Sequence, residues 1–385
     1  MAGYVFIGNS AKPSEKELNS REMIKFGNVS RPCLEIALEM GYDVYCGINR
    51  NNAEELKADI PVKLYDSHTY RSITAFRDNF IAYSNLKKLI KSKNIEVIHC
   101  NTPVGGMIGR LCGKMFDVKK VIYTAHGFHF YKGAPLFNRT VLKWAEMLMA
   151  HWSDAILTMN KEDYTAAKKF KLKKGGKVYY IPGVGIDTKD FATVKINRKD
   201  IRESLGVSED DIVCISMGDL IPRKNYGTAI KAIGKCKNKN IHYLICGEGS
   251  ELDNLRELAK ENNIENRVHF LGFRTDIKEL LKTADIFLFT TLQEGLPRSM
   301  MEAMASGLPC IASKIRGNVD LLEEGKGGYL VEIMDYSHIA NRLDILAEDS
   351  ELRKNMALYN LEHIKKFDVR EVKKIICNIY MEVLK

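Results

Sequence analysis

The sequence of 385 residues lacks the features that mark membrane-spanning, secreted and disulfide-bonded proteins. It has no run of about 18 apolar residues, so we expect no transmembrane helix. Its first residues, MAGYVFIGNS, lack the charged-then-apolar pattern of a signal peptide and predict a first strand instead. The nine cysteines include no C-x-x-C pair, which favours reduced thiols in a cytosolic protein.

Two common nucleotide-binding motifs and a zinc motif are also missing. No G-x-x-x-x-G-K-[ST] loop occurs, because Met115 follows Lys114 in the nearest match. The pair Gly247-Glu-Gly249 lacks the third glycine of a dinucleotide fingerprint. His126 and His129 have H-x-x-H spacing, but no third ligand accompanies them, so we predict no metal site.

The length and the charge distribution indicate two domains with different surfaces. A chain of 385 residues is too long for one ordinary core. Residues 1–190 hold 29 Lys and Arg against 19 Asp and Glu, a net charge of +10, whereas residues 191–385 have a net charge of −1. The first half is therefore the candidate face for an anionic partner, although a solvated basic surface explains the charge about as well.

The stretch from Thr290 to Ala312, TTLQEGLPRSMMEAMASGLPCIA, carries the most chemistry. A strand-like run precedes it, a glycine-bearing turn follows, and Pro297 and Ser299 suit the first positions of a helix that ends at Gly307. Strand, turn, helix and strand form the unit of a parallel sheet. The N–H groups at the start of such a helix suit a phosphate or diphosphate, and two carboxylates, Glu294 and Glu302, could each accept hydrogen bonds from a diol.

Glu294 and Glu302 have seven residues between them and match the E-x7-E signature of retaining glycosyltransferases of family 4. The run MASGLPCIAS resembles these enzymes too. HCNTPVGGMIGRL and TAHGFHFYKGAP resemble bacterial transferases that extend lipid-linked sugars in capsule and exopolysaccharide assembly. The resemblance implies the α/β GT-B fold, two Rossmann-like doubly wound domains facing each other across a cleft.

The order of strand and helix signals agrees with that architecture. We expect an N-terminal acceptor-side domain of residues 1–185 with 368–385, and a C-terminal domain of residues 186–367 that binds the nucleotide sugar. Two glycines and a proline in Pro182–Asp187 predict the hinge. The polar residues 8–28 predict a loop, the residues Leu136–Trp152 a long helix, and Val369–Leu384 a last helix that returns to the first domain.

The resemblance implies a set of donor-contacting residues. Lys224 falls at the family's lysine position, whereas Asp219 replaces the family's arginine, and we expect Arg223 to supply that second cation. Glu294 would bind the donor sugar, Glu302 the ribose diol, and His126, which follows a buried strand, would contact the donor sugar as well. The predicted donor site is completed by Gly295, Leu296, Pro297, Arg298, Ser299, Gly218, Phe273 and Arg274.

The sequence thus predicts a retaining hexosyltransferase that uses a UDP-sugar as co-substrate, without another cofactor. Because no D-x-D motif occurs, a metal-bridged diphosphate is not expected. The resemblance implies a polyprenyl-diphosphate-linked saccharide as acceptor, and the basic first domain favours peripheral attachment to the anionic inner face of the cell membrane. Nothing indicates nucleic-acid binding. Two alternatives stay open: a UDP-sugar epimerase on the same fold, and a non-catalytic protein that binds a sugar nucleotide or a polysaccharide.

Overall fold

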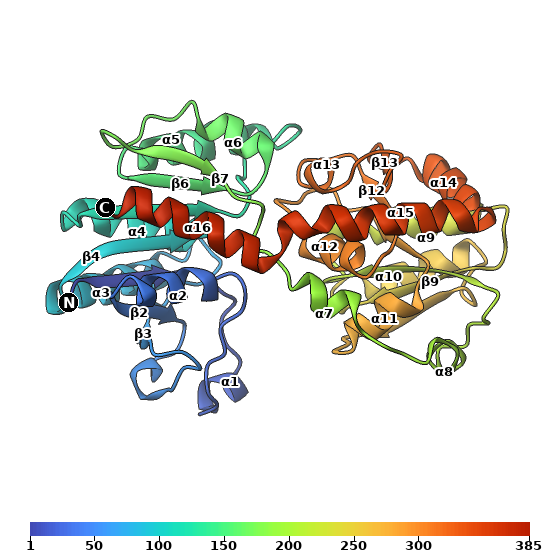
Figure 1. The fold of residues 1–385 in the computed structure, drawn as a ribbon, viewed down its shortest axis with the longest axis horizontal. Helices are drawn as coiled ribbons and strands as arrows, with labels where there is room; N and C mark the ends of the chain where they lie inside the picture. The colour runs from blue at the N-terminus through green and yellow to red at the C-terminus, as the bar shows by residue number, and fades with distance from the viewer. The chain divides into compact units, whose positions relative to one another are not determined.

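The computed structural model describes residues 1–385, apart from the side chains of Lys16 and Asn19, and it divides the chain into two units (Figure 1). The first unit comprises residues 1–185 and 369–385, and the second comprises residues 186–368. Asp368, which we expected in the first unit, belongs to the second. Its carboxylate accepts hydrogen bonds from the backbone N–H of Thr188 at 3.2 Å and from the Thr188 hydroxyl at 2.6 Å.

The first unit is built on a seven-stranded parallel sheet in the order β3-β2-β1-β4-β5-β6-β7. Its strands are β1 (Gly3–Ile7), β2 (Asp43–Ile48), β3 (Lys63–Asp66), β4 (Ile95–Asn101), β5 (Lys120–Ala125), β6 (Ala155–Thr158) and β7 (Lys177–Tyr180). Reversal of the strand order at β1 is typical of a doubly wound sheet.

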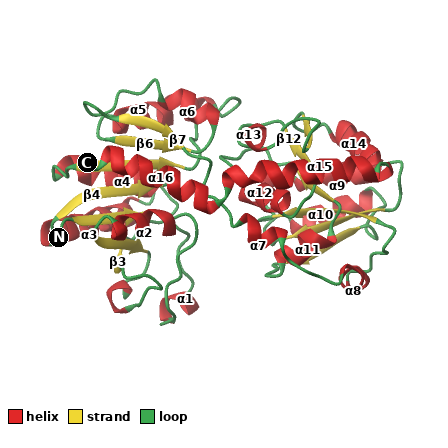
Figure 2. Ribbon diagram, in the orientation of Figure 1, coloured by secondary structure: helices red, strands yellow, loops and turns green.

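Helices cover this sheet (Figure 2). They are α1 (Glu15–Asn19), α2 (Arg31–Glu39), η1 (Ala53–Glu55), α3 (Phe76–Ser92), α4 (Pro103–Met115), η2 (Asn138–Leu142), α5 (Lys143–Ala150), α6 (Lys161–Ala167) and α16 (Val369–Val383). One prediction needs correction, because residues 8–28, expected as a loop, contain α1. The expected helix Leu136–Trp152 is helical from residue 136 to residue 150, and it includes the π-helical turn η2 and then α5.

Helix α16 belongs to the first unit, and a row of buried, hydrogen-bonded polar side chains fixes it to the first sheet. The Tyr380 hydroxyl of α16 lies 2.6 Å from the Tyr4 hydroxyl and 2.5 Å from Nδ1 of His99, whose Nε2 lies 2.7 Å from the Thr124 hydroxyl. Burial lowers the pKa of His99 to about 3, so the His99 imidazole is neutral at neutral pH. Fully buried polar groups that satisfy one another fix the position of a helix more sharply than apolar contacts alone.

The second unit has a six-stranded parallel sheet in the order β10-β9-β8-β11-β12-β13. Its strands are β8 (Ile212–Met217), β9 (Ile241–Cys246), β10 (Val268–Gly272), β11 (Ile286–Phe289), β12 (Cys310–Ser313) and β13 (Gly328–Val331). Its helices are α7 (Thr188–Ala192), α8 (Arg198–Ser204), η3 (Pro222–Lys224), α9 (Tyr226–Lys235), α10 (Leu252–Glu261), α11 (Ile277–Thr283), α12 (Arg298–Ala305), α13 (Asn318–Leu321), α14 (Tyr336–Glu348), α15 (Ser350–His363) and η4 (Ile364–Phe367).

Both sheets are apolar and buried along their central strands. The residues of β11 and β12 are all buried, as expected for parallel strands covered by helices on both faces. The α/β class predicted from the sequence is confirmed. Among the residues that the structure describes, no helix is both long and apolar enough to span a bilayer.

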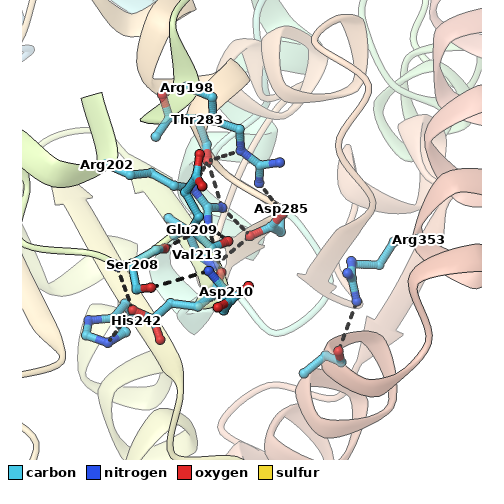
Figure 3. Close-up of polar contacts among 12 residues, drawn as sticks. Arg198, Arg202, Ser208, Glu209, Asp210, Val213, His242, Thr283, Asp285 and Arg353 are labelled. Atoms are coloured by element: carbon cyan, nitrogen blue, oxygen red, sulfur yellow. Dashed lines mark hydrogen bonds and ion pairs between the residues drawn. The ribbon is translucent and has the colours of Figure 1, made fainter. Parts of the chain in front are cut away.

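One buried cation ties the start of the second unit to its sheet (Figure 3). The Arg202 side chain is 2% exposed, and its Nη2 donates to Oδ2 of Asp285 at 2.6 Å. The other guanidinium nitrogens donate to the carbonyl oxygens of Ser208, Glu209, Asp211 and Thr283. Asp285 also accepts from the backbone N–H of Val213 at 2.8 Å, so one ion pair connects α8, β8 and the residue before β11.

We predict that Asp285→Asn destabilises the second unit by about 3 kcal/mol or more, because it leaves the Arg202 charge buried without a counterion. Native-state hydrogen exchange of the β8 amides in the whole chain measures this loss. Arg198→Ala is the matched control. Arg198 binds the same carboxylate, but its side chain is 47% exposed, so the cost should stay below about 1 kcal/mol. Equal losses of stability in Asp285→Asn and Arg198→Ala would contradict a special role of the buried Arg202–Asp285 pair.

Candidate active site

The predicted donor residues of the second unit lie in the loops that follow its strands or in the helices into which these loops lead. Because all six strands run parallel, the loops after β8, β10, β11 and β12 open at the same edge of the sheet. This edge is where ligands bind in open α/β sheets.

Two cations meet one carboxylate oxygen at this edge. Lys224, the last residue of η3, places Nζ 2.9 Å from Oε1 of Glu294. Arg223 places Nη1 3.1 Å from the same oxygen and 2.7 Å from the carbonyl oxygen of Gln293. Thr291 donates its hydroxyl to Oε1 as well, at 3.0 Å. The side chains of Lys224 and Glu294 are only 14% and 13% exposed, so water screens this pair weakly.

The two loops that carry these residues are joined by further hydrogen bonds. Asn225 adopts a left-handed backbone with φ of 52°, and its amide donates to the Thr290 carbonyl at 3.0 Å. The Thr290 hydroxyl donates to the Asn225 carbonyl at 2.8 Å, and Leu292 N–H donates to the Arg223 carbonyl at 2.9 Å. A left-handed asparagine is tolerated where its side chain is bonded locally. The loop after β8 and the loop after β11 therefore hold each other in place.

The turn from Gly295 to Ser299 leads into α12, which begins at Arg298. Pro297 is its N-cap and, among the described residues, no side chain caps the helix, so its first N–H groups have no side-chain partner. Arg316 donates Nε to the Glu294 carbonyl at 3.0 Å. Gly317, at φ of +80°, allows close approach, since a Cβ there would lie 2.4 Å from the Gly295 oxygen.

Glu302 forms a separate pair with Arg298, whose Nε lies 2.7 Å from Oε1 of Glu302. Burial raises the pKa of Glu302, while the Arg298 charge opposes that shift. The Arg298 side chain is 55% exposed and covers a carboxylate that is 14% exposed. The two glutamates of the motif thus have different partners: Glu294 binds the cations of the β8 loop, and Glu302 binds the first residue of its own helix.

The other predicted donor residues are placed as follows. Gly218 follows β8 with a φ of +137°, a backbone conformation that favours glycine, and it lies beside the Lys224 side chain. Phe273 follows β10 and is 74% exposed. Arg274 donates to Asp276 through two nitrogens, at 2.8 and 2.5 Å.

His126 lies in the first unit, directly after β5. It borders a cavity of about 360 Å³ whose lining includes Asn9, Arg71, Thr102, His126 and His129. Its Nε2 lies 3.1 Å from Oδ1 of Asn101, and burial lowers the pKa of His126 to about 4. An amide oxygen only accepts hydrogen bonds, so Nε2 carries the proton and Nδ1 is the acceptor.

Two family patterns match the chain. The pattern of "Glycosyl transferases group 1" matches residues 197–363, and that of "Glycosyl transferase 4-like" matches residues 29–169. EpsD of Bacillus subtilis (strain 168), which is classed with the glycosyltransferases, is 35% identical over 279 residues, 71% of this chain and 73% of EpsD. The chain belongs to glycosyltransferase family 4.

Two further proteins are similar to this glycosyltransferase, one in sequence and one in structure. The UDP-Gal:alpha-D-GlcNAc-diphosphoundecaprenol alpha-1,3-galactosyltransferase of Escherichia coli is 31% identical over 290 residues, 73% of this chain and 74% of that enzyme. The crystal structure of Anabaena HepE in complex with UDP and glucose superposes with a TM-score of 0.78 at 20% identity, over 99% of this chain and 100% of HepE. The GT-B fold predicted from the sequence is confirmed.

Sequence reasoning missed four residues of this glycosyltransferase that contact predicted site residues. Thr291, Gln293 and Arg316 contact Glu294 or its partners through the loops after β11 and β12. Asn101 contacts His126 and is 2% exposed, and its Nδ2 has no hydrogen-bond partner among the described residues. A signal was present for two of them, because Arg316 and Asn101 each stand at or just after the end of a buried strand.

We predict that Asn101→Asp raises the pKa of His126, since a carboxylate 3 Å away favours the imidazolium whereas the amide does not. Histidine NMR titration measures the change, and Asn101→Leu, which adds no charge, is the control. In the wild type, the native pKa of about 4 lies below the ordinary value of 6.5. Between these values the unfolded chain binds a proton that the native state does not, so His126 makes stability fall as the pH falls through this window. An unchanged His126 pKa in Asn101→Asp would contradict the contact.

Proposed function

We propose that this glycosyltransferase moves a hexose or N-acetylhexosamine from a UDP-sugar, with retention of anomeric configuration, to a polyprenyl-diphosphate-linked saccharide. The observation that carries the proposal is the meeting of Lys224 and Arg223 on one oxygen of Glu294, beside the uncapped start of α12. Two relatives support it: the E. coli galactosyltransferase is named for a UDP-sugar donor and a diphosphoundecaprenol acceptor, and HepE was solved with UDP-glucose. The biological setting would be surface polysaccharide synthesis.

The donor diphosphate fits the charge balance of this site. Two cations share one carboxylate, which leaves one positive charge without a counterion inside the cluster. A diphosphate would take up that charge, with Lys224 and Arg223 on one side and the N–H groups of Gly295–Ser299 on the other. Arg223 is the second cation of the proposal, because Asp219 stands where the family has arginine.

The two glutamates would hold the sugars on either side of the diphosphate. Glu302, whose carboxylate is paired with Arg298, would accept hydrogen bonds from the ribose diol. Glu294 would bind donor-sugar hydroxyls and favour positive charge at the anomeric carbon. His126, neutral at physiological pH, would contact the donor sugar through its acceptor Nδ1.

The main catalytic contribution would be stabilisation of the departing phosphate charge by Lys224, Arg223 and the start of α12. The acceptor hydroxyl would attack from the side of the leaving group, and the departing phosphate would accept its proton. In this mechanism Glu294 is not a covalent nucleophile. The acceptor would bind to the first unit, with its head group near Lys132, at the cytoplasmic face of the cell membrane.

A donor screen with release of UDP as the readout tests the proposal. UDP release that requires a lipid-linked acceptor supports a transferase. Conversion of a UDP-sugar without any acceptor would favour the epimerase alternative, and tight binding without turnover would favour a non-catalytic binding protein.

We predict that Lys224→Ala and Arg223→Ala each lower turnover by about a hundredfold or more, because each removes a cation from the leaving diphosphate. Steady-state UDP release measures turnover, and circular dichroism checks the fold. Lys314→Ala, which removes an exposed cation of the same unit, is the control and should keep full activity. Full activity in Arg223→Ala would show that this residue does not replace the arginine missing at Asp219.

We predict that turnover persists in excess chelator, since cations and helix N–H groups rather than a bridging metal would hold the diphosphate. The measurement is UDP release in the presence of EDTA. It is repeated on enzyme that has been dialysed against EDTA to remove bound metal. Loss of activity in EDTA that manganese or magnesium restores would overturn the metal-independent mechanism.

A further inference from the structure

One helical face of the first unit leaves large apolar side chains uncovered. From η2 into α5, the apolar residues follow one another at spacings of four, three and four, so they form one stripe along the helix. We call Phe137, Val141, Trp144 and Leu148, which are 60%, 52%, 73% and 58% exposed, the apolar stripe. Leu136, 74% exposed, lies at its start.

The rotation of α5 is fixed by contacts on its other side. Met147 and the buried Ala150 pack against the core of the first unit. Glu146 accepts a hydrogen bond from Nη1 of Arg110 at 2.8 Å, and the completely buried Arg110 lies 3.8 Å over the Tyr123 ring. Turning the apolar stripe inward would break this buried ion pair, so the stripe stays exposed.

Basic residues accompany the apolar stripe. Arg139 and Lys143 are exposed and, within the part of the chain that the structure describes, neither takes part in an ion pair. Glu146, the acidic residue of this segment, is already paired with Arg110. The segment therefore presents uncompensated positive charge next to tryptophan, phenylalanine and leucine, a combination that suits the interface of an anionic bilayer.

A second exposed apolar group lies in the same layer of helices. Phe76 and Phe80, 81% and 71% exposed, stand one turn apart at the start of α3, with the exposed Arg77 between them. Helix α3 packs on α4, and α4 packs on α5. The β3–α3 loop and the β5–η2 loop also both contribute to the cavity beside His126, through Arg71 and His129. The apolar groups thus begin at the two loops that border this cavity.

We propose that the apolar stripe, with Arg139 and Lys143, inserts into the headgroup region of an anionic phospholipid bilayer and so brings the cavity beside His126 to the membrane surface. The inference rests on the lipid-linked acceptor of the proposed function. It commits to a bilayer rather than a protein partner because unpaired cations flank the apolar residues, which complements an anionic surface.

The chain contains only two tryptophans, Trp144 and the half-buried Trp152, and this allows a direct test. In Trp152→Phe, all tryptophan fluorescence comes from Trp144. Addition of phosphatidylcholine vesicles that contain phosphatidylglycerol should shift its emission to the blue and protect it from a soluble quencher. Vesicles of phosphatidylcholine alone should give a much smaller change.

Co-sedimentation with the same vesicles measures the contribution of each residue. Trp144→Ala and Leu148→Ser should each weaken binding roughly tenfold, as expected for a large apolar side chain that leaves the lipid. Arg139→Gln and Lys143→Gln should each weaken it about fivefold at low salt, the equivalent of about 1 kcal/mol per basic residue. Leu358→Ser is the matched control, because Leu358 of the second unit is also 58% exposed and should have no effect.

Three outcomes would overturn the proposal: no spectral shift with anionic vesicles, equal binding of Leu148→Ser and wild type, or a dimer that Trp144→Ala converts to a monomer without loss of vesicle binding. The last would make the stripe an interface between copies of this chain. UDP release with a lipid-linked acceptor in detergent is measured in parallel. Transfer in detergent without vesicle binding would reject the membrane-binding role of the apolar stripe and leave the proposed function standing. No transfer to any lipid-linked acceptor would reject the proposed function itself.

Discussion

Every strand in both sheets runs parallel to its neighbours, so the loops that follow the strands gather along one edge of each sheet. The remaining features of the site depend on this constraint. Lys224 and Glu294 are 70 residues apart in sequence, yet β8 and β11 are neighbours, and the loops that follow them carry these two residues into contact. An antiparallel arrangement would send the two loops to opposite edges, and the contact would not form.

The contact between two cations and Glu294 gives the site a second property. The Glu294 carboxylate keeps Lys224 and Arg223 in position and lowers the cost of burying Lys224, whose side chain is 14% exposed. The diphosphate that we propose as ligand would then meet cations that are already oriented, which is the condition for strong electrostatic stabilisation of a leaving group. Arg223 donates both to the Glu294 carboxylate and to the Gln293 carbonyl, so two acceptors of the β11 loop orient its guanidinium group.

Local sequence patterns predicted most of the strands because buried parallel strands are short continuous apolar runs, such as Ile286–Phe289, bounded by turn residues. They did not predict β3, since Lys63–Asp66 has a charged residue at each end and only two apolar residues. The sequence also predicted Glu294, Glu302 and Lys224 as donor-site residues, and the structure places Lys224 in contact with Glu294; their roles stay a prediction.

Their partners were not predictable. Which cation meets Glu294 depends on strand order, and the role of Asn101 depends on a contact between the ends of β4 and β5. Helical periodicity places Trp144 and Leu148, four residues apart, on one face of the helix, but it does not decide whether that face is buried. The buried Arg110–Glu146 pair decides it, and a buried arginine in a glycine-rich helix gives no sign of its partner in the sequence.

The same strand, β5, supports both His126, which we propose contacts the donor sugar, and the exposed helix of the first unit. Tyr123 lies under the Arg110 guanidinium that holds α5, and His126 follows three residues later at the end of the strand. A packed core transmits displacement rather than absorbing it, so a shift of α5 against Tyr123 would reach the strand that positions His126. If α5 rests on a bilayer, the packing of α5 against β5 fixes the position of His126 relative to the membrane. The depth at which the helix sits then fixes the height of the cavity beside His126 above the lipid, which is the distance that a lipid-linked acceptor must bridge.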